Sequence, residues 1–127
     1  MQNLRFRRIP GFYAVCRFPA DSPIPGWARS GSFSSVTVTA DELSIVGSEE
    51  AVPGDVTAER GWACFKIEGP FAFSLTGVLE AFLDPLAKAT IPIFAVSTYD
   101  TDYVLVKQDD VASAIKALQQ AGHEFLG

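Results

Sequence analysis

The fold of this chain is decided by residues 61–125, which read GWACFKIEGPFAFSLTGVLEAFLDPLAKATIPIFAVSTYDTDYVLVKQDDVASAIKALQQAGHEF. Near the start of this stretch, Trp62–Glu68 mixes aromatic, aliphatic and polar residues as strands do. Leu75–Ala89 then carries apolar residues at helical spacing, namely Val78, Leu79, Phe82, Leu83 and Leu86. Pro85 removes a backbone donor inside this predicted helix, so we expect a kink or a loosened turn around Asp84 rather than the loss of the helix.

The rest of the stretch predicts two more strands, a second helix and a final strand. Ile91–Ser97 and Tyr103–Lys107 are short apolar runs with a turn-like segment between them. Asp109 or Asp110 can cap the next helix. Residues 123–126 can return as a last short strand. The predicted order is β-α-β-β-α-β, so the fold class is α+β with a ferredoxin-like unit in the C-terminal half.

The N-terminal half predicts strands and little helix. Residues 19–31 contain three prolines and two glycines, which favours a loop over a regular element. We expect a degenerate, strand-rich unit over residues 1–60 and a complete unit over residues 61–127, sharing a sheet or core because the first half is too small to stand alone. The strands predicted in the first half are Leu4–Ile9, Phe12–Phe18, Phe33–Thr39 and Glu42–Val46.

Composition excludes several classes of function. The 127 residues carry a net charge of −5, which argues against nucleic-acid binding. Cys16 and Cys64 lie far apart, without a neighbouring cysteine, and so support neither a zinc nor a redox motif. No apolar run approaches the length of a membrane span and no secretory leader opens the chain, so we expect a cytoplasmic protein without membrane contact. No motif requires a cofactor or predicts catalysis.

The same stretch, residues 61–125, resembles an ACT domain, and Ser35–Val46, SVTVTADELSIV, resembles the first half of small bacterial tandem ACT proteins related to the CASTOR-type arginine sensors. The resemblance covers nearly the whole chain. It implies two ACT-like units in tandem, able to build a continuous sheet, that bind an amino acid or similar small metabolite at an ACT–ACT junction. It also implies a sensor without catalytic activity, acting as a homodimer or on a protein partner. Val38 departs from the family pattern, which has a basic residue there.

The resemblance also implies a pocket. Its first wall is the segment Phe71–Val78, its second wall is the turn after the predicted strand Ile91–Ser97, and its third is a segment of another unit. The ligand-binding residues that the resemblance implies are Asp102, Thr98, Tyr99, Gly77, Thr76, Val78, Ala72, Ser35 and Val36.

The chemistry of these residues suits a zwitterion, although simpler explanations stay open. The Asp102 carboxylate can accept charge-assisted hydrogen bonds from an ammonium group or a cationic side chain. Gly77 permits close backbone approach at a helix start, where free N–H groups favour a carboxylate. One alternative is that Asp100 and Asp102 make an Asx-type turn. Another is that they bind a metal ion, although no third carboxylate or histidine stands in a recognisable metal-binding motif with them. His123, the only histidine, is predicted to be structural, with a partial positive charge that suits the end of a helix.

A second function also stays open, in which the fold serves purely as a protein–protein assembly module without a ligand. An open sheet edge in the degenerate first half would favour this alternative.

Overall fold

The computed structural model describes residues 3–72 and 74–127, and the chain divides into two compact units. Unit 2 is Ile9–Trp62, and unit 1 joins the described residues up to Arg8 to Ala63–Gly127. The second boundary lies near the expected one at residue 60. The first residues, however, group with the C-terminal half and not with the N-terminal half in which the sequence analysis placed them.

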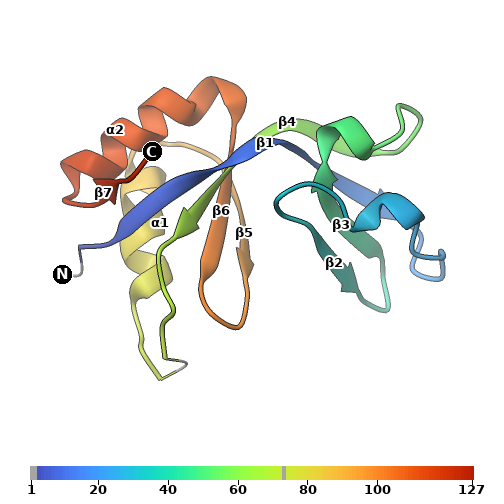
Figure 1. Cartoon of the computed structure of the whole chain (residues 1–127), viewed down its shortest axis with the longest axis horizontal. Coiled ribbons are helices and arrows are strands. Elements are labelled where there is room, and N and C mark those ends of the chain that lie inside the picture. The colour runs from blue at the N-terminus through green and yellow to red at the C-terminus, as the bar shows by residue number, and fades with distance from the viewer. Residues whose placement is uncertain (1–2, 73) are drawn as a thin grey trace. The chain divides into compact units, whose positions relative to one another are not determined.

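Unit 1 has the α+β composition predicted from the sequence (Figure 1). Its elements follow the order β-α-β-β-α-β, so the predicted ferredoxin-like order is confirmed. They are the C-terminal part of β4 (Ala58–Ile67), α1 (Val78–Lys88), β5 (Ile93–Ser97), β6 (Asp102–Lys107), α2 (Val111–Gln120) and β7 (Glu124–Phe125), with the 3₁₀ turn η3 (Gln108–Asp110) before α2.

An additional strand enters the sheet of unit 1. In a ferredoxin-like unit the last strand pairs with the first. Here β7 pairs instead in parallel with the start of β1 (Arg5–Phe18), and β1 in turn lies beside β4. The Glu68 N–H donates to the Arg5 carbonyl at 2.8 Å, and Arg7 forms an ion pair with Glu68. The strand order in unit 1 is therefore β5-β6-β4-β1-β7.

The predicted strands Leu4–Ile9 and Phe12–Phe18 form one continuous strand, β1, although Pro10 and Gly11 interrupt the apolar pattern. The Tyr13 hydroxyl donates to the Pro10 carbonyl at 2.7 Å, which gives that carbonyl a partner within the strand. The long strand explains the division of the chain, since Arg5–Arg8 belong to unit 1 and the residues from Ile9 onward belong to unit 2.

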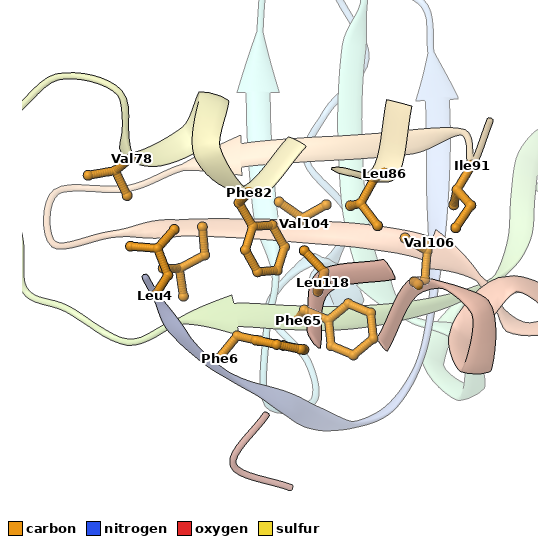
Figure 2. Packing of buried hydrophobic residues seen from close by; sticks show 12 residues of the cluster. Leu4, Phe6, Phe65, Val78, Phe82, Leu86, Ile91, Val104, Val106 and Leu118 are labelled. Atoms are coloured by element: carbon orange, nitrogen blue, oxygen red, sulfur yellow. The ribbon is translucent and has the colours of Figure 1, made fainter. Parts of the chain in front are cut away.

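The core of unit 1 lies between its sheet and its two helices. Buried aromatic and aliphatic side chains from β1, β4, β6, α1 and α2 point toward one another (Figure 2). Phe6 contacts three rings, Phe65 and Phe82 at centroid distances of 5.5 and 5.3 Å and Phe125 at 5.1 Å. The periodicity of residues 62–125 predicts the part of this core that comes from β4, β6, α1 and α2, because it places apolar side chains on one face of each element.

Helix α1 is shorter than the predicted Leu75–Ala89, and it continues through Pro85. It begins after Gly77, whose φ of +82° is a left-handed conformation that ends the helical path toward Leu75. Pro85 has no N–H to donate to the carbonyl of Ala81, one helical turn earlier. That carbonyl instead contacts His123 Nε2 at 2.9 Å.

His123 is a buried, structural residue, with a side chain only 4% exposed. The Leu4 N–H donates to His123 Nδ1 at 3.0 Å, so Nδ1 carries no proton. Nε2 then holds the proton and donates it to the Ala81 carbonyl. The structural assignment is therefore correct, but the expected positive charge is wrong because this pair of bonds requires a neutral ring.

Unit 2 is rich in strands and has no α-helix among its described residues (Figure 1). β2 (Ser35–Val38), β3 (Leu43–Ser48), β1 and β4 follow the order β2-β3-β1-β4. Between β1 and β2 lies the 3₁₀ turn η1 (Gly26–Ala28), and between β3 and β4 lies η2 (Glu49–Ala51). These two short turns stand where a ferredoxin-like unit has helices.

Candidate functional site

A small pocket of unit 1 lies where the chain passes from β5 to β6, beside the segment that leads into α1. Its volume is about 190 Å³. Five of the predicted ligand-binding residues line it together, and these are Ala72, Val78, Thr98, Tyr99 and Asp102. The remaining lining residues are Phe71, Leu75, Ser97, Asp100 and Thr101.

The turn between β5 and β6 is held by threonines. The Thr98 N–H donates to the Thr101 carbonyl at 2.8 Å, and the Thr98 hydroxyl donates to the same carbonyl at 3.1 Å. The buried Thr101 hydroxyl donates to the Ile67 carbonyl at 2.6 Å, which fixes the turn to β4. The floor of the pocket is therefore attached to the sheet and does not depend on a ligand for its position.

The same turn also fixes the segment on the opposite side of the pocket. The Phe71 N–H donates to the Asp100 carbonyl at 2.9 Å. A Cβ atom at Gly69 would approach that carbonyl oxygen to 2.9 Å, so a side chain at position 69 would push the two segments apart. Residue 73, in the middle of the predicted wall Phe71–Val78, lies outside the described residues.

The two aspartates of the turn differ in their surroundings. Asp102 is half-buried at the start of β6, and its carboxylate accepts a hydrogen bond from the hydroxyl of Ser97, the residue directly opposite in the β5–β6 register. Asp100 is exposed, and among the described residues the side-chain bonds of the turn come from the threonines. Asp102 therefore presents an oriented carboxylate at the pocket, whereas Asp100 contributes its backbone carbonyl to the turn.

The predicted residues near α1 are only partly in the pocket. Val78 is the buried first residue of the helix and lines the pocket. Gly77 caps the helix without a side-chain hydrogen bond and lines a different groove of about 710 Å³, together with Glu80, Asp84 and the end of α2. Thr76 lies in the exposed segment just before the helix.

Ser35 and Val36 lie on β2 in unit 2. They line a groove of about 490 Å³ with Ile24, Arg29 and other residues of the η1 segment. Sequence reasoning also missed Ser97, which holds Asp102. A signal for it exists, because two strands joined by a tight turn place the residue before the turn opposite the residue after it.

Metal binding and a membrane span find no support. The part of the chain that the structure describes contains no cluster of three or more His, Cys, Asp or Glu side chains that could hold a metal ion. Within the same residues, no helix is both long and apolar enough to cross a membrane.

The two thiols are buried and free. Burial raises the pKa of Cys64 to about 12 and also raises the pKa of Cys16, because a thiolate loses its hydration inside the protein. A nucleophilic role for either thiol is therefore disfavoured near neutral pH.

We expect both thiols to react with a disulfide reagent at pH 8 at least about tenfold more slowly in the folded protein than in denaturant. The unfolded chain ionises these thiols at lower pH than the folded chain does. The stability that depends on Cys64 is therefore complete below pH 9, the ordinary thiol value, and is lost as the pH rises toward about 12. Equal labelling rates with and without denaturant would contradict the burial of the thiols.

Comparison with known proteins identifies the family of this chain and finds structures of similar fold. A family model described as an ACT domain matches residues 57–120, and a second model, of an N-terminal domain, matches residues 11–55. The chain is 28% identical over 106 residues to the human cytosolic arginine sensor for mTORC1 subunit 1, a match that covers 80% of this chain and 32% of the relative. The bovine protein of the same name is 32% identical over 104 residues, covering 76% and 31%. The chain thus spans about a third of the length of these curated relatives.

Solved structures resemble this chain over most of its length. A protein from Agrobacterium tumefaciens is 41% identical, with a TM-score of 0.94, and the match covers 99% of this chain and 94% of that one. The regulatory subunit of aspartate kinase from Thermus thermophilus is 15% identical, with a TM-score of 0.58 over 87% of this chain and 93% of that one. The second likeness concerns the fold alone.

Proposed function

This chain belongs to the ACT domain family, and from that membership we propose that it is a non-catalytic regulatory module that binds an amino acid or a similar small metabolite. The observation that carries the proposal is the oriented carboxylate of Asp102 at the rim of a small pocket. The human and bovine relatives support the ligand class, since both are described as cytosolic arginine sensors.

The chemistry of the pocket fits a zwitterionic ligand. The Asp102 carboxylate would accept hydrogen bonds from the ammonium group or from a cationic side chain. At the other side of the pocket, Val78 begins α1, whose first turn has no side-chain cap, and N–H groups at such a helix start favour a carboxylate. Thr98 and Tyr99 would form the wall between these two ends. The Tyr99 side chain is 79% exposed, and a bound ligand would cover part of the ring.

The junction is also part of the proposal. We propose that unit 2 is a degenerate ACT-like unit, corresponding to the domain predicted over residues 1–60, and that unit 1 is the ACT domain predicted over residues 61–127. The support is that both units place a hairpin, β2-β3 or β5-β6, at the edge of the sheet. Ser35 and Val36 would supply a further wall from a second ACT-like unit. No cofactor, catalytic residue, nucleic acid or membrane enters this proposal, and the site of action would be cytoplasmic.

The test is a thermal-melt screen of the dialysed protein against the common amino acids. A ligand present at about 100 times its dissociation constant adds about 2.7 kcal/mol to the free energy of unfolding, which raises the melting midpoint by several degrees for a chain of this size. A flat panel, with a bound ligand excluded by native mass spectrometry, would contradict the proposal.

Asp102→Asn is expected to weaken binding of the ligand found in this screen about 10- to 100-fold, because it removes the charge and keeps the shape and the partner Ser97. Isothermal titration measures the change. Asp109→Asn, just beyond the far end of β6, is the matched control and should leave the dissociation constant nearly unchanged, since this exposed side chain does not line the pocket. Equal effects of the two substitutions would remove Asp102 from the site.

One observation favours a second function, a ligand-free assembly module. Unit 2 exposes two valines on the edge strand β2. A flat ligand panel together with stable association of the chain would favour this function over ligand sensing.

A further inference from the structure

The serine and threonine hydroxyls that line the pocket between β5 and β6 all give their protons to protein acceptors. The Ser97 hydroxyl donates to the Asp102 carboxylate. The Thr98 hydroxyl donates to the Thr101 carbonyl at 3.1 Å, and the Thr101 hydroxyl donates to the Ile67 carbonyl at 2.6 Å. A hydroxyl has one proton, so once it has donated it can only accept further hydrogen bonds. These three side chains therefore offer a ligand acceptors and no donors.

The place of Ser97 follows from the register of the hairpin. The bond from the Thr98 N–H to the Thr101 carbonyl closes the turn, and hydrogen-bonded pairs alternate along antiparallel strands. Ser97 and Asp102, one step further, are therefore a non-hydrogen-bonded pair, whose side chains lie close together on one face of the sheet. Val104, two positions after Asp102, is buried in the core of unit 1, so this face is the one that the helices cover.

The charge of the pocket favours a cation. Among the described residues that line it, two are aspartates and none is lysine, arginine or histidine. Asp102 uses Oδ1 for the bond from Ser97, and within the described part of the chain no donor reaches its Oδ2. A positively charged donor fits this wall, whereas a carboxylate or a phosphate would meet charge of its own sign.

We propose that Ser97 is itself a ligand-binding residue, and that its oxygen and Oδ2 of Asp102 together accept two hydrogen bonds from one ammonium group. This inference rests on the proposed function, because it assigns the end of the pocket that takes the ammonium group of the ligand. An ammonium carries three N–H donors, so two of them can reach acceptors on neighbouring side chains. The carboxylate of the ligand would then lie toward Val78, at the start of α1.

The two residues depend on each other. The bond from Ser97 fixes one oxygen of the Asp102 carboxylate, so the other oxygen is oriented before the ligand arrives, and a preordered side chain loses less conformational entropy on binding. In the other direction, the Asp102 carboxylate takes the Ser97 proton and thereby keeps the Ser97 oxygen an acceptor. Removing either residue should therefore remove most of what the other contributes to binding.

The bond between Ser97 and Asp102 contributes little to the fold, which allows binding and stability to be measured apart. The Ser97 side chain is exposed, and the turn is held by Thr98 and Thr101 instead. An exposed substitution of this kind usually changes stability by less than about 0.5 kcal/mol. The melting midpoint of the protein without ligand should therefore stay nearly unchanged in Ser97→Ala.

The test is isothermal titration of Ser97 variants with the amino acid that gives the largest shift in the thermal-melt screen. Ser97→Ala should weaken binding about tenfold or more, because it removes an acceptor for a charged group and releases Asp102. Ser97→Thr keeps the hydroxyl at a strand position that suits a β-branched residue, and it should bind within about threefold of the unsubstituted chain. Ser113→Ala is the matched control, since Ser113 is exposed on α2 and lies outside the pocket.

A double-mutant cycle tests the dependence of the two residues on each other. Ser97→Ala added to Asp102→Ala should weaken binding by less than about threefold, whereas independent contacts would give the product of the two single losses.

The outcomes separate this inference from the proposed function. A flat amino-acid panel would overturn both. Binding that falls with Asp102→Asn but not with Ser97→Ala would overturn the inference alone. Independent losses in the cycle, a loss in Ser97→Thr equal to that in Ser97→Ala, or an equal loss in Ser113→Ala would do the same.

Discussion

Replacing Phe6 with alanine is expected to lower the free energy of unfolding by about 3–5 kcal/mol, the usual cost of deleting a buried aromatic ring. Phe6 is fully buried and packs edge-on against Phe65 and Phe82 (Figure 2). The loss combines the transfer of the ring out of water with the cavity that these rigid neighbours cannot fill. Urea unfolding followed by circular dichroism measures the change in the midpoint.

Arg5→Ala is the control for this substitution. Arg5 precedes Phe6 on the same strand and its side chain is exposed, so its loss should change stability by less than about 0.5 kcal/mol. Comparable losses from both substitutions would mean that Phe6 contributes only strand propensity. A negligible loss from Phe6→Ala would remove β1 from the core of unit 1.

Replacing His123 with alanine is expected to cost about 2–4 kcal/mol, because it leaves two inward-facing backbone groups without partners. These groups are the Leu4 N–H and the Ala81 carbonyl. The Ala81 carbonyl would be left without any donor, because Pro85 has no N–H to donate to it within the helix. Chemical denaturation measures the loss.

Two amide variants separate the two bonds of His123. Asn places an acceptor near the position of Nδ1 and should keep the bond from Leu4, whereas Gln places a donor near the position of Nε2 and should keep the bond to Ala81. Each variant is expected to recover part of the stability lost in His123→Ala. If both are as unstable as the alanine variant, packing of the ring against Phe82 carries the effect.

The sequence predicts the elements of unit 1 well because the information is local. The apolar spacing of Val78, Phe82 and Leu86 encodes one face of a helix, and that face is the one buried. The place of β1 between β4 and β7 is not local, since it depends on pairing with residues more than a hundred positions away. The exact start of α1 was also missed, because the left-handed Gly77 ends the helix inside an apolar pattern.

The candidate site was likewise predicted only in part from the sequence. Family resemblance alone gathered Asp102, Thr98 and Tyr99, which the structure places around one pocket. It also assigned Gly77 to that pocket, whereas this residue lines the neighbouring groove beside α1 and the end of α2. The prediction of a positive charge on His123 was wrong for a physical reason. It considered only the dipole of the nearby helix α2, whereas the two hydrogen bonds to distant segments determine the protonation of the ring.

The bond between Leu4 and His123 spans 119 positions of the chain, and this separation bears on how the protein is made. Unit 2 consists of Ile9–Trp62, so all of its residues have been synthesised when about half of the chain has left the ribosome. Leu4, Arg5 and Phe6 lack their partners in β7 and at His123 until the end of the chain is translated. A nascent chain paused before residue 123 would thus carry a finished unit 2 and an uncovered Phe6, the kind of apolar surface that chaperones bind.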